Sequence, residues 1–181
     1  MKKTILLFLS CFLWQVTVMR ATDVDDIDNV IYISPLTAAA GSTSVQLSIS
    51  MKNSVPIRGF QFKLYLPDGV NAHKNANGKI IPKLVSERLG EDDVHTIQVS
   101  EHDGYLLVTS SSEAIENFLG NDGPVATLEV DISPSIAEGA HTVELREIKL
   151  SETDISKYYE TELLEFTLTI DGVDDGRIHF D

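Results

Sequence analysis

The stretch "IRGFQFKLYLPDGV", residues 57–70, places a large apolar side chain at every second position. The apolar members are Phe60, Phe62, Leu64 and Leu66. In an extended strand, neighbouring side chains point to opposite faces, so these four predict a strand with one buried side. Gln61, Lys63 and Tyr65 lie between them and would point the other way. The stretch therefore predicts a core-lining strand whose second row is available for contacts.

The same alternation recurs through most of the chain, as in "SVQLSISMK" at 44–52 and "VATLEVDI" at 125–132. Counting the opening stretch, nine segments fit a strand pattern. The other six are residues 30–34, 79–85, 94–100, 104–110, 141–150 and 164–170. Short strands that each have one apolar side predict two sheets packed face to face.

Three local signals modify this pattern. Pro82 lacks a backbone N–H, so segment 79–85 is expected to be an edge or broken strand. The apolar phase slips between Leu145 and Ile148, which predicts a β-bulge. Segment 111–120 is expected to form one helical turn, with Ile115, Phe118 and Leu119 closing an open end of the sandwich.

The first residues have the order of a secretory signal peptide: Lys2 and Lys3, an apolar run, and small residues ending at Ala21. The apolar run is shorter than the roughly 20 residues that a membrane-spanning helix needs. Cys11 leaves a lipid-modified cysteine as an alternative. We therefore expect residues 1–21 to be a signal peptide and the protein to be exported, either secreted or held at the cell surface.

Charge and cysteine content exclude several classes. The chain has 14 basic and 28 acidic residues, a formal net charge of −14. Nucleic acids and anionic membranes require clusters of Lys and Arg, so neither is an expected partner. Removing residues 1–21 would remove the one Cys and the one Trp, so the mature fold would depend on burial and not on disulfides. One compact domain of ordinary size is expected.

Three elements resemble the cohesin family in order and spacing. They are the strand "RGFQFKLYLPDGV", the segment "SSSEAIENFLGNDGPVATLEVDIS" and the segment "GAHTVELREIKLS". The match covers residues 29–171. The resemblance implies an all-β, nine-stranded jelly-roll sandwich of two antiparallel sheets with little helix. It also implies a non-catalytic module that binds a dockerin through the flat face of one sheet, in assemblies that degrade polysaccharides.

The first candidate site is the outward row of the opening strand together with its expected sheet neighbours. Tyr, Arg, an exposed Leu and hydrogen-bonding groups are what protein interfaces favour, although a solvated sheet face has a similar composition. The predicted partner-binding residues are Gln61, Lys63, Tyr65, Tyr105, Leu107, Thr109 and Arg146. Leu106 and Leu107 are adjacent, so only one of them can point inward.

The second candidate is carbohydrate binding, as in carbohydrate-binding modules of the same architecture. Sugar rings stack on flat aromatic side chains, and the mature chain would have no Trp. Tyr158 and Tyr159, expected in a loop, are the best sugar-stacking residues, although packing on the rim of the sandwich explains them as well. A third reading is a structural stalk that spaces another domain from the cell surface.

No metal site or cofactor is expected. The acidic leader at residues 22–28 contains four Asp but lacks the Gly and distal Glu of a calcium loop. The terminal "DGVDDGRIHFD" faintly resembles the start of a dockerin, yet Val173 stands where a ligand is needed. Residues 172–181 are therefore expected to be a linker or the start of a missing module.

An enzyme is not expected either. The five His are scattered without metal-ligand spacing, and the serines at 110–112 lack the strained turn of a nucleophile. The sequence thus predicts an exported binding or assembly module with a protein partner or a polysaccharide ligand.

Overall fold

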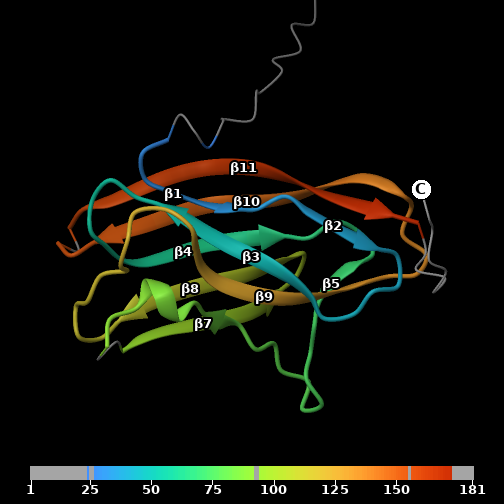
Figure 1. Ribbon diagram of the computed structural model, residues 1–181, viewed down its shortest axis with the longest axis horizontal. Helices are drawn as coiled ribbons and strands as arrows, with labels where there is room; N and C mark the ends of the chain where they lie inside the picture. The colour runs from blue at the N-terminus through green and yellow to red at the C-terminus, as the bar shows by residue number, and fades with distance from the viewer. Residues whose placement is uncertain (1–23, 25–26, 92–93, 155, 173–181) are drawn as a thin grey trace, which may run out of the picture.

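The computed structural model describes residues 24, 27–91, 94–154 and 156–172 (Figure 1). The predicted signal peptide with Cys11, most of the acidic leader and residues 173–181 lie outside the described residues. Within the described part, no helix is long and apolar enough to cross a membrane. The chain is built of strands, as the alternation predicts.

The strands form two sheets. The six-stranded sheet has the order β2 (Leu36–Ala39), β11 (Tyr158–Asp171), β10 (Gly139–Glu152), β4 (Ile57–Tyr65), β8 (Tyr105–Ser112) and β7 (His95–His102). The five-stranded sheet has the order β1 (Val30–Ile33), β3 (Val45–Lys52), β9 (Pro124–Ile132) and β5 (Val70–Ala72), with β6 (Lys83–Leu84) also paired to β9. In Figure 1 the long strands run roughly horizontally, with β11 at the top and β7 at the bottom.

The predicted β-sandwich is confirmed, but the structure has eleven strands where nine were expected. The two additional strands are β2 and β5, of four and three residues, too short for alternation to reveal. Segment 79–85 is reduced to β6, as Pro82 predicts. One pair also departs from the expected antiparallel pattern, because β2 runs parallel to β11. Pro35, which cannot donate a ladder hydrogen bond, separates β1 in one sheet from β2 in the other.

The core lies between the two sheets, and β4 is its central contributor. Phe62 and Leu64 are fully buried and Phe60 is 3% exposed. Facing them, the other sheet contributes Leu47 and Leu128. Fully burying one such side chain stabilises the fold by about 1.5–3 kcal/mol, so the inward row of β4 is a large part of the driving force.

The predicted helical turn at 111–120 is absent, and this expectation was wrong. The segment is a turn followed by irregular chain, and a 3₁₀ turn, η2 (Ser86–Arg88), occurs elsewhere. Of the three expected closing residues, only Phe118 is buried, stacked 5.7 Å from Phe60. Ile115 and Leu119 are 54% and 48% exposed. The burial of side chains keeps alternating through residues 110–112, so residues 111 and 112 extend β8 instead.

The predicted β-bulge in β10 is confirmed. The pairing of β10 with β4 shifts between Arg146 and Lys149, and Glu147 has a φ of 52°. Such a bulge lets Leu145 and Ile148 both point into the core, where both are buried. The polar residues Arg146 and Lys149 on either side of the bulge therefore share the outer face.

Gly59 is required where β4 pairs with β8. A Cβ on Gly59 would lie 2.7 Å from the backbone oxygen of Ser110, closer than Cβ atoms in proteins approach other atoms. We predict that Gly59→Ala lowers the free energy of unfolding by about 1–3 kcal/mol, the usual cost of forcing extra atoms into a packed site. The measurement is urea denaturation, with Gly90→Ala as the control, because nothing lies within 4 Å of the corresponding position there. Equal effects of the two changes would contradict this reading.

Arg88 is a buried cation that ties η2 to the five-stranded sheet. It is 5% exposed and donates to the backbone oxygens of Met51 and Gly123, at 3.4 Å each, and to Oδ1 of Asn53 at 3.1 Å. Burial lowers the pKa of Arg88, while Asp122 acts in the opposite direction. These hydrogen bonds connect the end of β3 and the turn before β9 to the same guanidinium group.

We predict that Arg88→Leu lowers the free energy of unfolding by about 1–3 kcal/mol, because the Met51 backbone oxygen and Oδ1 of Asn53 would lose a buried donor, whereas the half-buried Gly123 oxygen still accepts from the Met51 amide. Urea denaturation followed by circular dichroism measures the change. Lys79→Leu, which removes an exposed cation, is the control. An Arg88 variant as stable as the Lys79 variant would show that the guanidinium does not hold these segments.

Candidate functional site

The structure brings all seven predicted partner-binding residues onto one surface, the outer face of β10, β4, β8 and β7. Lys63 in β4 pairs with Leu107 in β8 on one side and with Arg146 in β10 on the other. Gln61 pairs with Thr109 in the same way. We call this surface the outer face. Alternation on the neighbouring strands places these side chains side by side.

Leu107 points outward. It is half-buried, whereas its neighbour Leu106 is 6% exposed and belongs to the core. The ambiguity between the two leucines is thus resolved by the register of β8 with β4, in which Leu64 pairs with Leu106.

Four side chains form a continuous row across the end of the outer face, which we call the stacked row: His102, Tyr105, Tyr65 and Arg146. His102 stacks on Tyr105 with ring centres 4.9 Å apart and planes within 8°. Tyr105 lies 5.6 Å from Tyr65, and the Arg146 guanidinium lies 4.6 Å from the Tyr65 ring. Aromatic pairs and cation–π contacts of this kind each contribute about 0.5–1.5 kcal/mol.

The cations of the outer face are paired with carboxylates of β10 and β11. Lys63 pairs with Glu147, Arg146 with Glu144, and Lys149 with Glu160. In each pair the hydrogen bond to the carboxylate raises the pKa of the cation. Exposed pairs contribute little to stability, so their main effect is to hold long side chains in position.

Several members of this surface were missed in the sequence analysis. Glu144 and Lys149 follow from outward alternation on β10 once the bulge is allowed for. Glu147 lies at the bulge itself, and its position has no signal beyond the slip in apolar phase. His102 could have been found because it precedes a hairpin turn and comes to lie directly opposite Tyr105.

Tyr158 and Tyr159 do not lie in a loop, and this expectation was wrong. They begin β11, so their side chains point to opposite sides. Tyr158 is 58% exposed, with Lys149 Nζ 5.7 Å from its ring. Tyr159 packs against the core and donates to Glu152 Oε1 at 2.6 Å, which raises the pKa of Tyr159. Two rings on opposite sides of a strand cannot form one stacking platform.

The part of the outer face around Gly59 carries mostly uncharged polar groups, together with Arg58 and Lys149. A shallow hollow of about 340 Å³ opens there above Gly59, which has no side chain to fill it. The hollow is lined by Arg58, Gly59, Phe60, Gln61, Thr109, Ser110, Ser111, Lys149 and Ser151. This surface therefore offers hydroxyl, amide and backbone groups next to the charged half.

The outer side of the five-stranded sheet is used for internal contacts. His73 Nδ1 lies 2.8 Å from Asp131 Oδ1, and Lys83 Nζ lies 3.0 Å from Glu129. Burial raises the pKa of Asp131, but hydrogen bonds from the Ser44 amide and His73 outweigh it and leave this pKa below its ordinary value. These contacts hold segment 73–84 alongside the edge of β9, with which β5 and β6 pair.

Within the described residues, no group of three or more His, Cys, Asp or Glu side chains is placed to hold a metal ion. The acidic residues 23, 25 and 26 lie outside that part of the chain. The chemistry that the outer face offers is therefore stacking, ion pairing and hydrogen bonding.

Solved structures resemble this architecture over most of the chain. A type I cohesin–dockerin complex from Clostridium thermocellum aligns with a TM-score of 0.61 and 18% identity, covering 80% of this chain and 100% of that one. The sixth cohesin from scaffoldin B of Acetivibrio cellulolyticus, in complex with a dockerin, gives 0.60 and 15%, covering 80% and 100%. The fold is that of cohesin modules.

A non-cellulosomal cohesin from the archaeon Archaeoglobus fulgidus also has this fold, with a TM-score of 0.58, 14% identity, and coverage of 80% of this chain and 92% of that one. Comparisons with protein-family models and with curated proteins found no match. At these sequence identities the similarity to cohesins shows the fold alone. Any role of the outer face must therefore be argued from its own residues.

We predict that Tyr105→Ala disturbs the stacked row without unfolding the protein. The variant loses two aromatic pairs, with His102 and with Tyr65, and each should cost about 0.5–1.5 kcal/mol. In the unaltered chain, the stacked Tyr105 ring should shift the imidazole protons of His102 upfield in the NMR spectrum. The variant should return them toward unfolded values and leave His141, which bonds to the Ala137 backbone oxygen, unchanged. An unaltered His102 spectrum in the variant would contradict the stacking.

Proposed function

We propose that this chain is a non-catalytic binding module that recognises a protein partner through the outer face of β10, β4, β8 and β7. The observation that carries the proposal is the stacked row, in which Tyr65 and Tyr105 lie between Arg146 and His102 on a regular sheet. Tyr and Arg are the residues most enriched among those that dominate binding energy at protein interfaces.

The outer face is also pre-organised. Lys63 and Arg146 are held by Glu147 and Glu144, and their tyrosine neighbours are held by one another. Binding then costs less conformational entropy, because these side chains are already ordered before the partner arrives. The nearby uncharged groups around Gly59 supply hydrogen bonds at the margin of the contact.

The proposed partner is a dockerin-type module. Two of the solved structures that share this fold are cohesins captured with dockerins, from Clostridium thermocellum and Acetivibrio cellulolyticus. A dockerin partner would place the chain in an exported assembly, which agrees with the signal-peptide pattern at residues 1–21. We propose residues 29–171 as the binding domain and residues 172–181 as a linker toward a further module.

The experiment is affinity capture with the purified protein from culture fluid of the source organism, followed by mass spectrometry and calorimetry with the captured protein. We expect a partner that contains a dockerin module. The double change Lys63→Ala with Tyr65→Ala should weaken binding roughly 30-fold or more, the size of a typical interface hot spot of about 2 kcal/mol. Its thermal midpoint should fall by only a few degrees, because Tyr65 loses its contacts with Tyr105 and Arg146 while the core is unchanged.

Lys83→Ala is the matched control, because Lys83 is also an ion-paired lysine but lies in the other sheet. It should leave binding unchanged. If the double variant binds normally, the outer face is not the interface. If the protein is instead retained by insoluble polysaccharide, the carbohydrate-binding reading replaces the proposal, and retention by neither favours a stalk.

A further inference from the structure

The edge strands of the two sheets differ sharply in length. Among the described residues, β1 and β2 have four residues each, β5 has three and β6 has two, whereas β7 has eight. An edge strand presents unpaired backbone N–H and C=O groups to other chains, and short edge strands are a common protection against this. β7, the lowest of the long strands in Figure 1, is one of two long edges in the part of the chain described; the other is residues 158–167 of β11, with which β2 does not pair.

Of the other usual protections, β7 has one inward-pointing charge, Glu101, which is paired with Lys74. Its sequence, "HTIQVSEH", contains neither Pro nor Lys, and its eight residues pair with β8 without a register shift. Segment 73–84 approaches β7 from the side of the other sheet, through β6 and Lys74, but does not pair with it. A regular, uninterrupted edge of this kind is a template for a further strand.

The apolar side of β7 is incompletely covered. Ile97 and Val99 point inward and pack on the core, yet both are only half-buried. Their counterparts on the central strand β4, Phe62 and Leu64, are fully buried. One further strand beside β7 would cover the exposed flanks of Ile97 and Val99.

The order of residues in β7 is complementary to itself. In an antiparallel pair of two β7 strands centred on Gln98, Ile97 of each copy lies opposite Val99 of the other. Thr96 lies opposite Ser100, and Gln98 lies opposite itself. Residues 96–100 therefore each meet one of similar size and polarity, as stable cross-strand pairs require, and His95 of each copy meets Glu101 of the other. A two-fold axis that runs perpendicular to the sheet, midway between the two Gln98 residues, produces this arrangement, the commonest symmetry of protein dimers.

We infer that β7 is a self-association edge, which pairs antiparallel with β7 of a second copy of this chain about Gln98. The two six-stranded sheets then form one continuous sheet. Both outer faces lie on the same side, which would make the pair bivalent for any partner of that face. The inference depends on β7 alone and stands whether or not the proposed function is correct.

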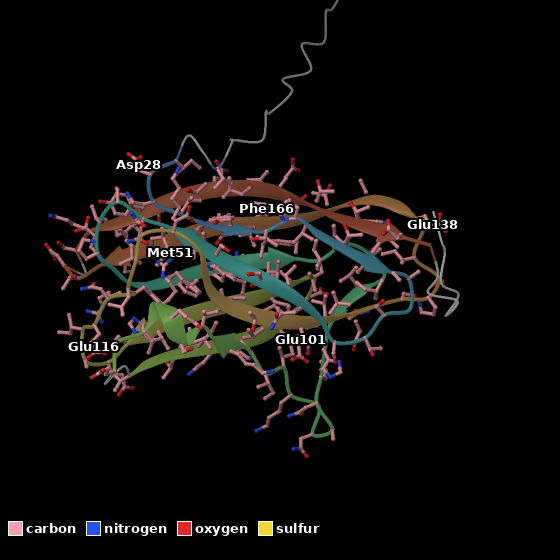
Figure 2. All side chains as sticks on the ribbon, in the orientation of Figure 1. Asp28, Met51, Glu101, Glu116, Glu138 and Phe166 are labelled. Atoms are coloured by element: carbon pink, nitrogen blue, oxygen red, sulfur yellow. The ribbon has the colours of Figure 1, made fainter. Side chains whose placement is uncertain are left out.

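The net charge of the chain determines how this association depends on salt concentration. The net charge of −14 makes two copies repel each other, but β7 has only one acidic residue, Glu101. Glu101, labelled in the lower part of Figure 2, pairs with Lys74 at 2.7 Å. Repulsion between whole chains is screened by salt, whereas hydrogen bonds and apolar contacts between strands are not. The association should therefore strengthen as salt is added.

The test is sedimentation equilibrium of the full chain at increasing concentration, in low and moderate salt. The apparent mass should rise from one chain toward two, with tighter association at the higher salt. Gln98→Lys places two like charges directly opposite and should weaken association about fivefold or more. Gln98→Glu should do the same, and an equal mixture of the two variants should restore association through Lys–Glu pairs.

Thr167→Lys is the matched control, since it adds the same charge to an exposed position on β11, which three strands separate from β7 in the same sheet. Added positive charge reduces the net charge, so this control should not weaken association. A monomer at every concentration would overturn the inference. So would a dimer that Gln98→Lys leaves intact, or variants that fail to recover when mixed.

Discussion

Burial of the inward row of β4 governs the rest of this structure. Phe60, Phe62 and Leu64 can leave water only if a second sheet covers them, and β3 and β9 provide that cover. Because side chains alternate along a strand, burying this row forces Gln61, Lys63 and Tyr65 onto the opposite side. The core and the outer face are therefore two results of one constraint.

That constraint also explains why the outer face is rigid. β4 lies in the middle of the six-stranded sheet, and Gly59 lets it lie close against β8. Side chains carried by a central, hydrogen-bonded strand vary little in position, and the ion pairs and ring contacts restrict them further. A surface of this kind is suited to binding a preformed partner at low entropic cost.

Irregular features of the sheets place side chains where regular alternation would not. The bulge at Glu147 keeps Leu145 and Ile148 in the core and, in doing so, sets Glu147 beside Lys63. The unusually long edge strand β7 extends the outer face to the margin of the sheet and leaves Ile97 and Val99 half-covered. Such local departures from a uniform sheet distinguish this structure from a plain sandwich.

Alternation in the sequence was enough to predict the class of fold, the core row of β4 and the outward direction of Gln61, Lys63 and Tyr65, because side-chain direction alternates within a single strand. It could not reveal β2 and β5, whose three or four residues carry too little pattern, nor the parallel pairing of β2 with β11. Only the tertiary structure decided that Leu107 and not Leu106 faces outward, through the register of β8 with β4, and that Arg88 is buried against β3 and the turn before β9. The register of β7 with β8 likewise decided that His102 lies opposite Tyr105. These outcomes depend on how strands and segments pair, and alternation within one strand carries no information on pairing.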